Sequence, residues 1–154
     1  MTSLSRRDTA ELIKDEVVRY WAKKVYSCYK EVGLVRRGRL RADIFAFNMK
    51  RNFIICEVKS CWADFSTDTK WHKYLDHCHK MYICITEKLW NSKSEEFTER
   101  LKGTSVGVMV VSSSGVRVVR NAKANKGTLK NSTWMLTKLA WAGGENRSSL
   151  RRRC

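Results

Sequence analysis

Three side chains that could hydrolyse a phosphodiester bond stand near the ends of two apolar stretches of the sequence. Asp43 lies near the start of residues 42–48, and Glu57 and Lys59 close residues 53–59. Because side chains alternate along a strand, Glu57 and Lys59 would point to the same face, and a hairpin can bring Asp43 beside them. We therefore expect two carboxylates and an ammonium group to meet at the end of a strand pair.

This set of groups suits metal-assisted hydrolysis. Carboxylate oxygens are preferred ligands of Mg²⁺ and Mn²⁺, so Asp43 and Glu57 would bind the metal ion. The ion would polarise a phosphoryl oxygen, while Lys59 could orient the attacking water, help to deprotonate it or offset charge in the transition state. The alternative is an exposed Glu–Lys pair beside a strand-capping Asp43. The apolar residues 53–56 weigh against it, because Glu and Lys are rarely buried without partners.

The charge balance indicates a polyanionic partner. The chain carries 31 Lys and Arg against 15 Asp and Glu, a formal net charge of +16. Such a field attracts nucleic acid first and anionic membranes second, whereas small soluble domains usually carry a net charge of magnitude roughly 2–8. A merely basic surface is the alternative. No apolar run approaches the ~20 residues that span a bilayer, and residues 1–8 lack the apolar core of a secretory signal. We therefore expect a cytoplasmic protein that binds DNA and no membrane.

The periodicity of apolar residues predicts the elements that position these groups. A capping-box-like start at residues 5–8 and helical spacing predict a first helix that ends near residue 23. Strands are predicted at residues 25–32, 42–48, 53–59, 81–86, 106–111 and 116–120. Further helices are predicted at residues 68–78, within residues 88–102 and at residues 131–141, with residues 61–67 as a loop. This order predicts an α/β domain over residues 1–142, with a mixed sheet flanked by helices, followed by a basic, mobile tail at residues 143–154.

The residues around the acids resemble a known superfamily. The stretches R-A-D-I at residues 41–44 and I-I-C-E-V-K at residues 54–59 resemble the split signature of the PD-(D/E)XK nucleases. The run E-V-K-S at residues 57–60, followed by D-F-S-T-D-T-K-W-H-K-Y at residues 64–74, resembles more closely the MmcB-type DNA repair proteins of that superfamily. The similarity covers residues 11–120.

The resemblance implies a restriction-endonuclease-like core of order αβββαβ, with a C-terminal hairpin and helix added. It also implies that Asp43 and Glu57 are metal ligands and that Lys59 is catalytic. Members often add an acid from the first helix, for which Glu11 has the better spacing and Glu16 is the alternative; either could instead face solvent. The chain departs from the family pattern at Ala42, where a proline is usual, and at C-H instead of C-D at residues 78–79.

Basic and aromatic residues are expected to contact DNA on both sides of the acids in the sequence. They are Arg36, Arg37, Arg39, Arg41, Trp62, Lys70, Lys73, Lys123 and Lys126. The cations would contact phosphates, which position DNA without reading its sequence. Trp62 could stack on an unpaired base or belong to the core. A zinc site built from His72, His77, Cys78 and His79 is disfavoured, because their spacing matches no zinc ribbon or finger.

These observations predict a DNA endonuclease that uses Mg²⁺ or Mn²⁺ in the repair or processing of damaged or branched DNA, as a monomer or a homodimer. Two alternatives stay open. One is a DNA-binding module of the same fold without nuclease activity. The other is an interaction protein that inhibits another nucleic-acid enzyme.

Overall fold

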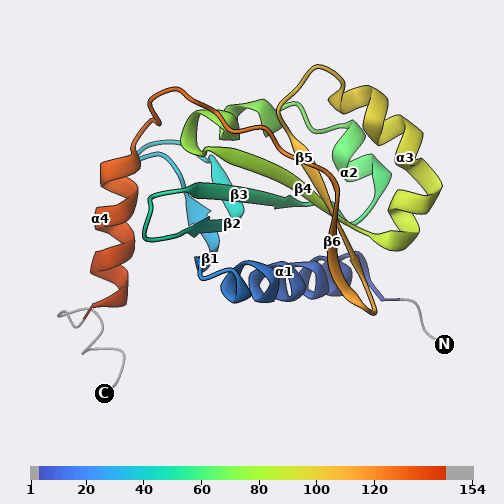
Figure 1. Ribbon diagram of the computed structural model, residues 1–154, viewed down its shortest axis with the longest axis horizontal. Coiled ribbons are helices and arrows are strands. Elements are labelled where there is room, and N and C mark those ends of the chain that lie inside the picture. The colour runs from blue at the N-terminus through green and yellow to red at the C-terminus, as the bar shows by residue number, and fades with distance from the viewer. Residues whose placement is uncertain (1–3, 145–154) are drawn as a thin grey trace.

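A single mixed sheet organises the computed structural model, which describes residues 4–144. Its six strands lie in sequence order, as Figure 1 shows. They are β1 (Ser27–Gly33), β2 (Arg41–Phe47), β3 (Phe53–Val58), β4 (Lys80–Thr86), β5 (Gly107–Ser112) and β6 (Gly115–Arg120). The pairs β1–β2, β2–β3 and β5–β6 are antiparallel, whereas β3–β4 and β4–β5 are parallel. The predicted mixed α/β architecture is therefore confirmed.

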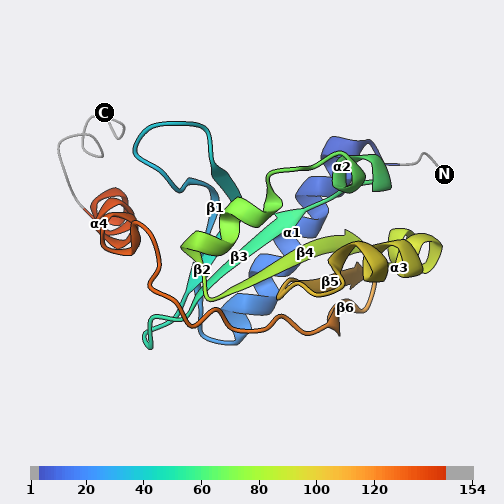
Figure 2. The same ribbon diagram turned by 90° about the horizontal axis from the view of Figure 1, so that it is seen from above.

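Helices cover both faces of the sheet. On one face lies α1 (Arg6–Lys23), and on the other lie α2 (Trp62–Ser66), the 3₁₀ helix η1 (Trp71–His77) and α3 (Glu87–Leu101) (Figures 1 and 2). The last helix, α4 (Ser132–Gly143), stands beside the sheet at the end where β1 and β2 lie. Most of the predicted tail, residues 145–154, falls outside the described residues. No helix in the described range is long and apolar enough to cross a membrane.

The alternation along β3 separates two hydrophobic cores. Phe53 and Ile55 pack with the residues of η1 and α3, whereas Ile54 and Cys56 pack beneath α1. All four side chains are buried, which accounts for the unbroken apolar run that identified this strand. Glu57, the next residue in the alternation, therefore points to the face that η1 and α3 cover.

The segment between β3 and β4 differs from the prediction. The expected loop at residues 61–67 contains the short helix α2, and the expected α-helix at residues 68–78 is the shorter 3₁₀ helix η1. Polar side chains cause this change, because they bond to nearby backbone groups and end the helical run. The Thr67 hydroxyl donates to the Ala63 carbonyl (2.6 Å), and Asp68 Oδ1 accepts from the Lys70 backbone (2.7 Å).

The polar stretch after β4 is more regular than expected. The sequence suggested a loop followed by a helix within residues 88–102, but α3 fills nearly the whole range and bends at Lys93, whose backbone is not helical. Thr86 makes this early start possible, since its hydroxyl oxygen accepts from the Leu89 backbone at 3.2 Å and caps the helix.

Candidate active site

Two carboxyl groups accept hydrogen bonds from the backbone of β2 and β3 beyond the last paired residues of these strands. The last register pair toward this end is Ile44 with Cys56. Beyond it the Asp43 backbone N–H donates to Glu57 Oε1 at 2.9 Å, and the Val58 N–H donates to Asp43 Oδ2 at 2.8 Å. The structure thus brings Asp43 and Glu57 together as strand alternation and the hairpin predict. These bonds fix each carboxyl group through one oxygen.

The two carboxyl groups are difficult to ionise together. Glu57 is only 4% exposed, and burial together with the adjacent Asp43 charge raises its pKa to about 8. Burial also raises the pKa of Asp43, despite the opposing hydrogen bond from the Val58 backbone. Two neighbouring acids whose pKa values are raised in this way favour a nearby cation, because a cation stabilises both ionised forms.

Lys59 supplies positive charge to this pair and is itself held by Asp68. Its Nζ lies 2.5 Å from Asp68 Oδ2, and the side chains are 11% and 13% exposed. The charge of Lys59 lowers the pKa values of Asp43 and Glu57. Burial would raise the pKa of Asp68, but the hydrogen bonds from Lys59 and from the Lys70 backbone outweigh it, so that pKa is lowered.

Lys14, on α1, places a positive charge near Asp43. Lys14 is 9% exposed and contacts Glu11 (3.2 Å) and Glu31, and its charge lowers the pKa of Asp43. Burial would lower the pKa of Lys14, but its bonds to Glu31 and Glu11 raise it. Glu11, the acid expected from this helix, has a side chain 54% exposed and reaches the site only through Lys14. The alternative, Glu16, pairs with Arg19 at 3.0 Å.

Glu31 is a site residue that nothing in the sequence indicated. It lies opposite Asp43, between the register pairs formed by its neighbours, and has a left-handed φ of 56°. This irregularity turns its carboxylate toward Lys14 and Arg41, whose Nε lies 3.1 Å from Glu31 Oε2. Lys14 could have been suspected from its position three residues before the buried Val17, on the apolar side of α1.

Tyr74 links η1 to β2 near the two carboxyl groups. Its ring is buried, and its hydroxyl donates to the Arg41 carbonyl at 3.1 Å, which ties η1 to the strand that carries Asp43. Burial and the nearby Glu57 and Asp43 charges raise the pKa of Tyr74, so the hydroxyl keeps its proton.

The Tyr74→Phe variant is expected to lose about 1 kcal/mol of unfolding free energy, because the part-buried hydrogen bond to the Arg41 carbonyl is lost while the ring packing is kept. Urea denaturation followed by tryptophan fluorescence measures this loss. A Tyr20→Phe variant, whose ring is half-exposed on α1, provides the control and should change little. Equal stability of Tyr74→Phe and the unmodified protein would show that this hydrogen bond does not hold η1 in place.

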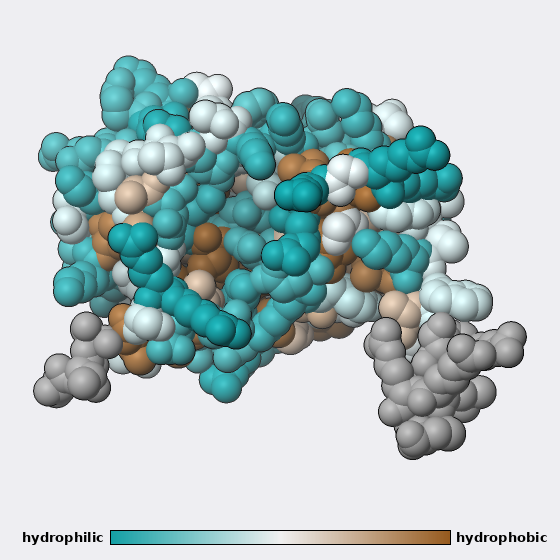
Figure 3. Space-filling model, turned by 180° about the vertical axis from the view of Figure 1, so that it is seen from behind, coloured by the Kyte–Doolittle hydropathy of each residue, from teal (hydrophilic) through white to brown (hydrophobic). Residues whose placement is uncertain are grey.

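The residues expected to contact DNA are nearly all exposed. Exposed cations stand on the loop between β1 and β2, on β2 itself, around η1 and after β6; they are Arg36, Arg37, Arg39, Arg41, Lys70, Lys73, Lys123 and Lys126. Figure 3 shows one face of the molecule, on which hydrophilic side chains dominate and hydrophobic ones form only small patches. Trp62 differs, because it is half-buried with its ring against Phe65 (5.7 Å) and Phe97 (5.0 Å), which places it beside the core.

The histidines near η1 have structural partners. His79 Nδ1 accepts from the Phe53 backbone at 2.9 Å, and His77 Nδ1 lies 3.1 Å from the Lys130 carbonyl. Within residues 4–144, no group of three or more His, Cys, Asp and Glu side chains is arranged to hold a metal ion. Asp43 and Glu57 nevertheless fit Mg²⁺, because this ion is commonly bound by one or two carboxylates, with water and phosphate completing its shell.

The family match gives the class of the protein, because the MmcB-like family is part of the PD-(D/E)XK superfamily. The chain belongs to the MmcB-like family of DNA repair proteins, whose sequence model matches residues 1–148.

Two solved structures are similar to the chain. One is SPO1766, a protein of unknown function from Silicibacter pomeroyi; at 22% identity and a TM-score of 0.70, the match covers 98% of this chain and 90% of that one. This likeness shows the fold. The other is SfsA of Pyrococcus furiosus in complex with Ca²⁺, at 15% identity and a TM-score of 0.35 over 76% of this chain and 62% of that one. A comparison with curated proteins gave no match.

Proposed function

We propose that the protein is a DNA endonuclease that hydrolyses phosphodiester bonds with Mg²⁺ or Mn²⁺ and acts in DNA repair. The observation that carries this proposal is the reciprocal bonding of Asp43 and Glu57, which fixes a half-buried and a buried carboxyl group side by side under the influence of the Lys59 charge. Membership of a DNA repair family supports the setting and the choice of DNA as substrate.

The side chains divide the chemical work. Asp43 and Glu57 would hold the metal ion, which when bound polarises the phosphate and acidifies a water molecule. Lys59 is held in an ion pair with Asp68. This favours two of its three expected roles, orienting the water and offsetting transition-state charge, over that of a base. Tyr74 and Asp68 position the groups without contacting the substrate.

The substrate would be held through its phosphates. Arg39 and Arg41 precede Asp43 closely in the chain, and Lys70 and Lys73 follow Asp68; all four cations are exposed. Contacts of this kind give affinity that depends strongly on salt and little on base sequence.

A DNA-binding module without hydrolytic activity is the second candidate. It is favoured by the burial of Glu57 and by the Lys59–Asp68 pair, in which the Lys59 side chain is only 11% exposed. A nuclease with this arrangement would need η1 or the segment at residues 59–70, which contains α2, to shift when DNA and metal bind.

Conversion of supercoiled plasmid to nicked circles distinguishes the two candidates. We expect nicking with Mg²⁺ or Mn²⁺, none in EDTA, and a loss of at least about a hundredfold in the Asp43→Asn variant, because an amide binds hard cations far more weakly than a carboxylate. Asp15→Asn, an exposed acid on α1, is the matched control. DNA binding in EDTA by a protein that never nicks would support the binding module and contradict the nuclease.

A further inference from the structure

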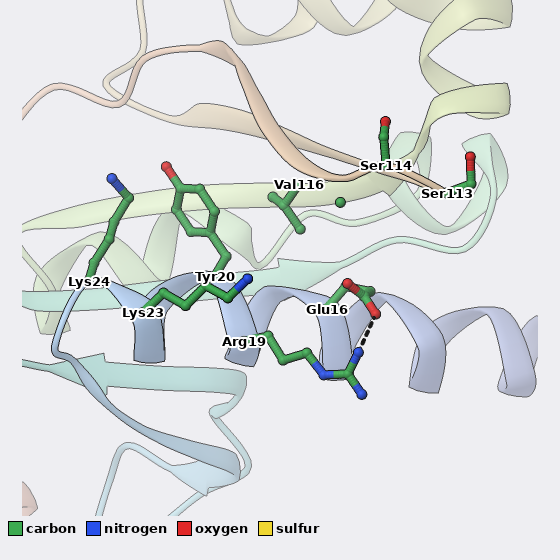
Figure 4. A pocket seen from close by; sticks show the side chains of 9 residues that line it. Glu16, Arg19, Tyr20, Lys23, Lys24, Ser113, Ser114 and Val116 are labelled. Atoms are coloured by element: carbon green, nitrogen blue, oxygen red, sulfur yellow. Dashed lines mark hydrogen bonds and ion pairs between the residues drawn. The ribbon is translucent and has the colours of Figure 1, made fainter.

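A groove runs between α1 and the turn that joins β5 to β6, with a volume of about 660 Å³. We call it the rear groove. Its main polar lining comprises Arg19, Tyr20, Lys23 and Lys24 on α1, and Ser113 and Ser114 on the turn. Figure 4 shows Tyr20 and Lys24 rising from α1 toward the hairpin, with the two serines on the turn above the helix.

The rear groove is a basic site with hydroxyl groups opposite the cations. Glu16 is its one acid, and it is bonded to Arg19 at 3.0 Å. Lys23 and Lys24 form no ion pair with any residue of the described range 4–144, and Lys24 Nζ lies 5.1 Å from the centre of the Tyr20 ring. Lysine, arginine, serine and tyrosine side chains are the groups that commonly contact nucleic-acid phosphates.

A simpler explanation covers part of this charge. Basic residues near the end of a helix stabilise its dipole, and Lys23 and Lys24 stand at that end of α1. The dipole does not require a groove beside these lysines, nor a lining that also contains the Tyr20 and serine hydroxyls. The combination of cations, hydroxyls and a hollow surface therefore favours a bound phosphate ester.

The rear groove and the carboxylates lie on opposite faces of the sheet. Ile54 and Cys56 pack beneath α1, and Glu57 alternates to the other face. Lys14 reaches Asp43 from α1, but the rear groove lies on the side of α1 next to the β5–β6 hairpin, so the sheet separates a phosphate held there from the Glu57 face.

We propose that the rear groove binds the sugar–phosphate backbone of a second nucleic-acid segment while a first segment lies at the carboxylates. The proposal deepens and rests on the proposed function, because it assigns the first segment to the Asp43 face. A protein with two such faces would suit substrates in which two duplex arms lie close together.

Capture of one duplex by another tests the proposal. A duplex is fixed to beads, the protein is added in EDTA, and retention of a second, fluorescent duplex is measured. We expect the Lys23→Gln/Lys24→Gln variant to retain about tenfold less of the second duplex than the unmodified protein, because two phosphate contacts are lost. The control variant, Lys50→Gln/Lys102→Gln, removes two exposed lysines outside the groove and should retain it normally.

The outcomes separate this proposal from the proposed nuclease. Because EDTA prevents metal-dependent cleavage, bridging can succeed whether or not the protein cuts DNA, and single-duplex binding is measured in parallel. Equal bridging by the groove variant and the control would overturn the proposal. That result is expected if two copies of the chain bridge the duplexes through their Asp43 faces. Loss of bridging at low inorganic phosphate concentrations would also overturn it, by showing a site for small phosphates instead of a nucleic-acid backbone.

Discussion

The Glu57→Gln variant is expected to nick plasmid at least about a thousandfold more slowly than the unmodified protein. Without metal, it is also expected to be more stable than the unmodified protein at pH 8. The first effect follows from removing one of the two proposed metal ligands, a loss of several kcal/mol of transition-state stabilisation. The second follows from removing a buried carboxyl group whose ionised form lacks enough positive charge nearby. Residues that catalysis requires commonly lower the stability of the folded state in this way.

The sign of the stability effect follows from the pKa shift. The pKa of Glu57 is about 8 in the folded protein against 4.5 for the ordinary side chain. Between these values the folded state binds more protons than the unfolded state, so stability falls as the pH rises from about 4.5 to 8. Glutamine does not titrate. The advantage of Glu57→Gln should therefore grow over this window, to on the order of a few kcal/mol, and then level off.

Urea denaturation in EDTA at a series of pH values measures this difference. Glu16→Gln, a substitution of the same type on α1, is the control and should show no such growth. A difference between Glu57→Gln and the unmodified protein that stays constant from pH 5 to pH 8 would mean that Glu57 is not held in a raised-pKa environment.

The Lys59→Met variant should lose both activity and stability, and the two losses should separate in a double variant. Removing the ammonium group leaves the Asp68 carboxylate, 13% exposed, without its cation, at a cost of about 3 kcal/mol. Adding Asp68→Asn removes that unpaired charge. We expect Lys59→Met/Asp68→Asn to recover most of the stability but to nick plasmid at least about a hundredfold more slowly than the unmodified protein.

Thermal denaturation and plasmid nicking on the unmodified protein, Lys59→Met, Asp68→Asn and the double variant complete this cycle. Recovery of nicking along with stability in the double variant would show that Lys59 serves only to satisfy Asp68. Loss of nicking in a stable protein assigns Lys59 a role in the reaction.

The strands and the meeting of Asp43 with Glu57 could be predicted because both depend on a strict alternation. Residues 53–56 are apolar without interruption, and the acid that follows must then lie at the end of a buried strand. A short hairpin fixes which residue of β2 faces it. The local sequence therefore contains most of the information that places these two carboxyl groups.

The surroundings of the carboxylates could not be predicted in the same way. Glu31 adopts a left-handed φ that glutamate rarely favours, and only the packing of β1 against β2 and α1 imposes it. The pairing of Lys59 with Asp68 depends on where α2 ends, which local bonds of Thr67 and Asp68 decide. The sequence does not distinguish Lys14 from a surface lysine, because a lysine beside an apolar stripe usually keeps its ammonium group in water.

Binding of Mn²⁺, followed by calorimetry and by electron paramagnetic resonance, tests most directly whether Asp43 and Glu57 form a cation site. The unmodified protein should bind Mn²⁺ in competition with Mg²⁺, more tightly as the pH rises toward 8, because bound metal must displace the proton held on the carboxyl pair. Asp43→Asn and Glu57→Gln should each lose this binding while remaining folded. Mn²⁺ uptake that is unchanged in both variants, or absent from the unmodified protein at pH 8, would contradict the site.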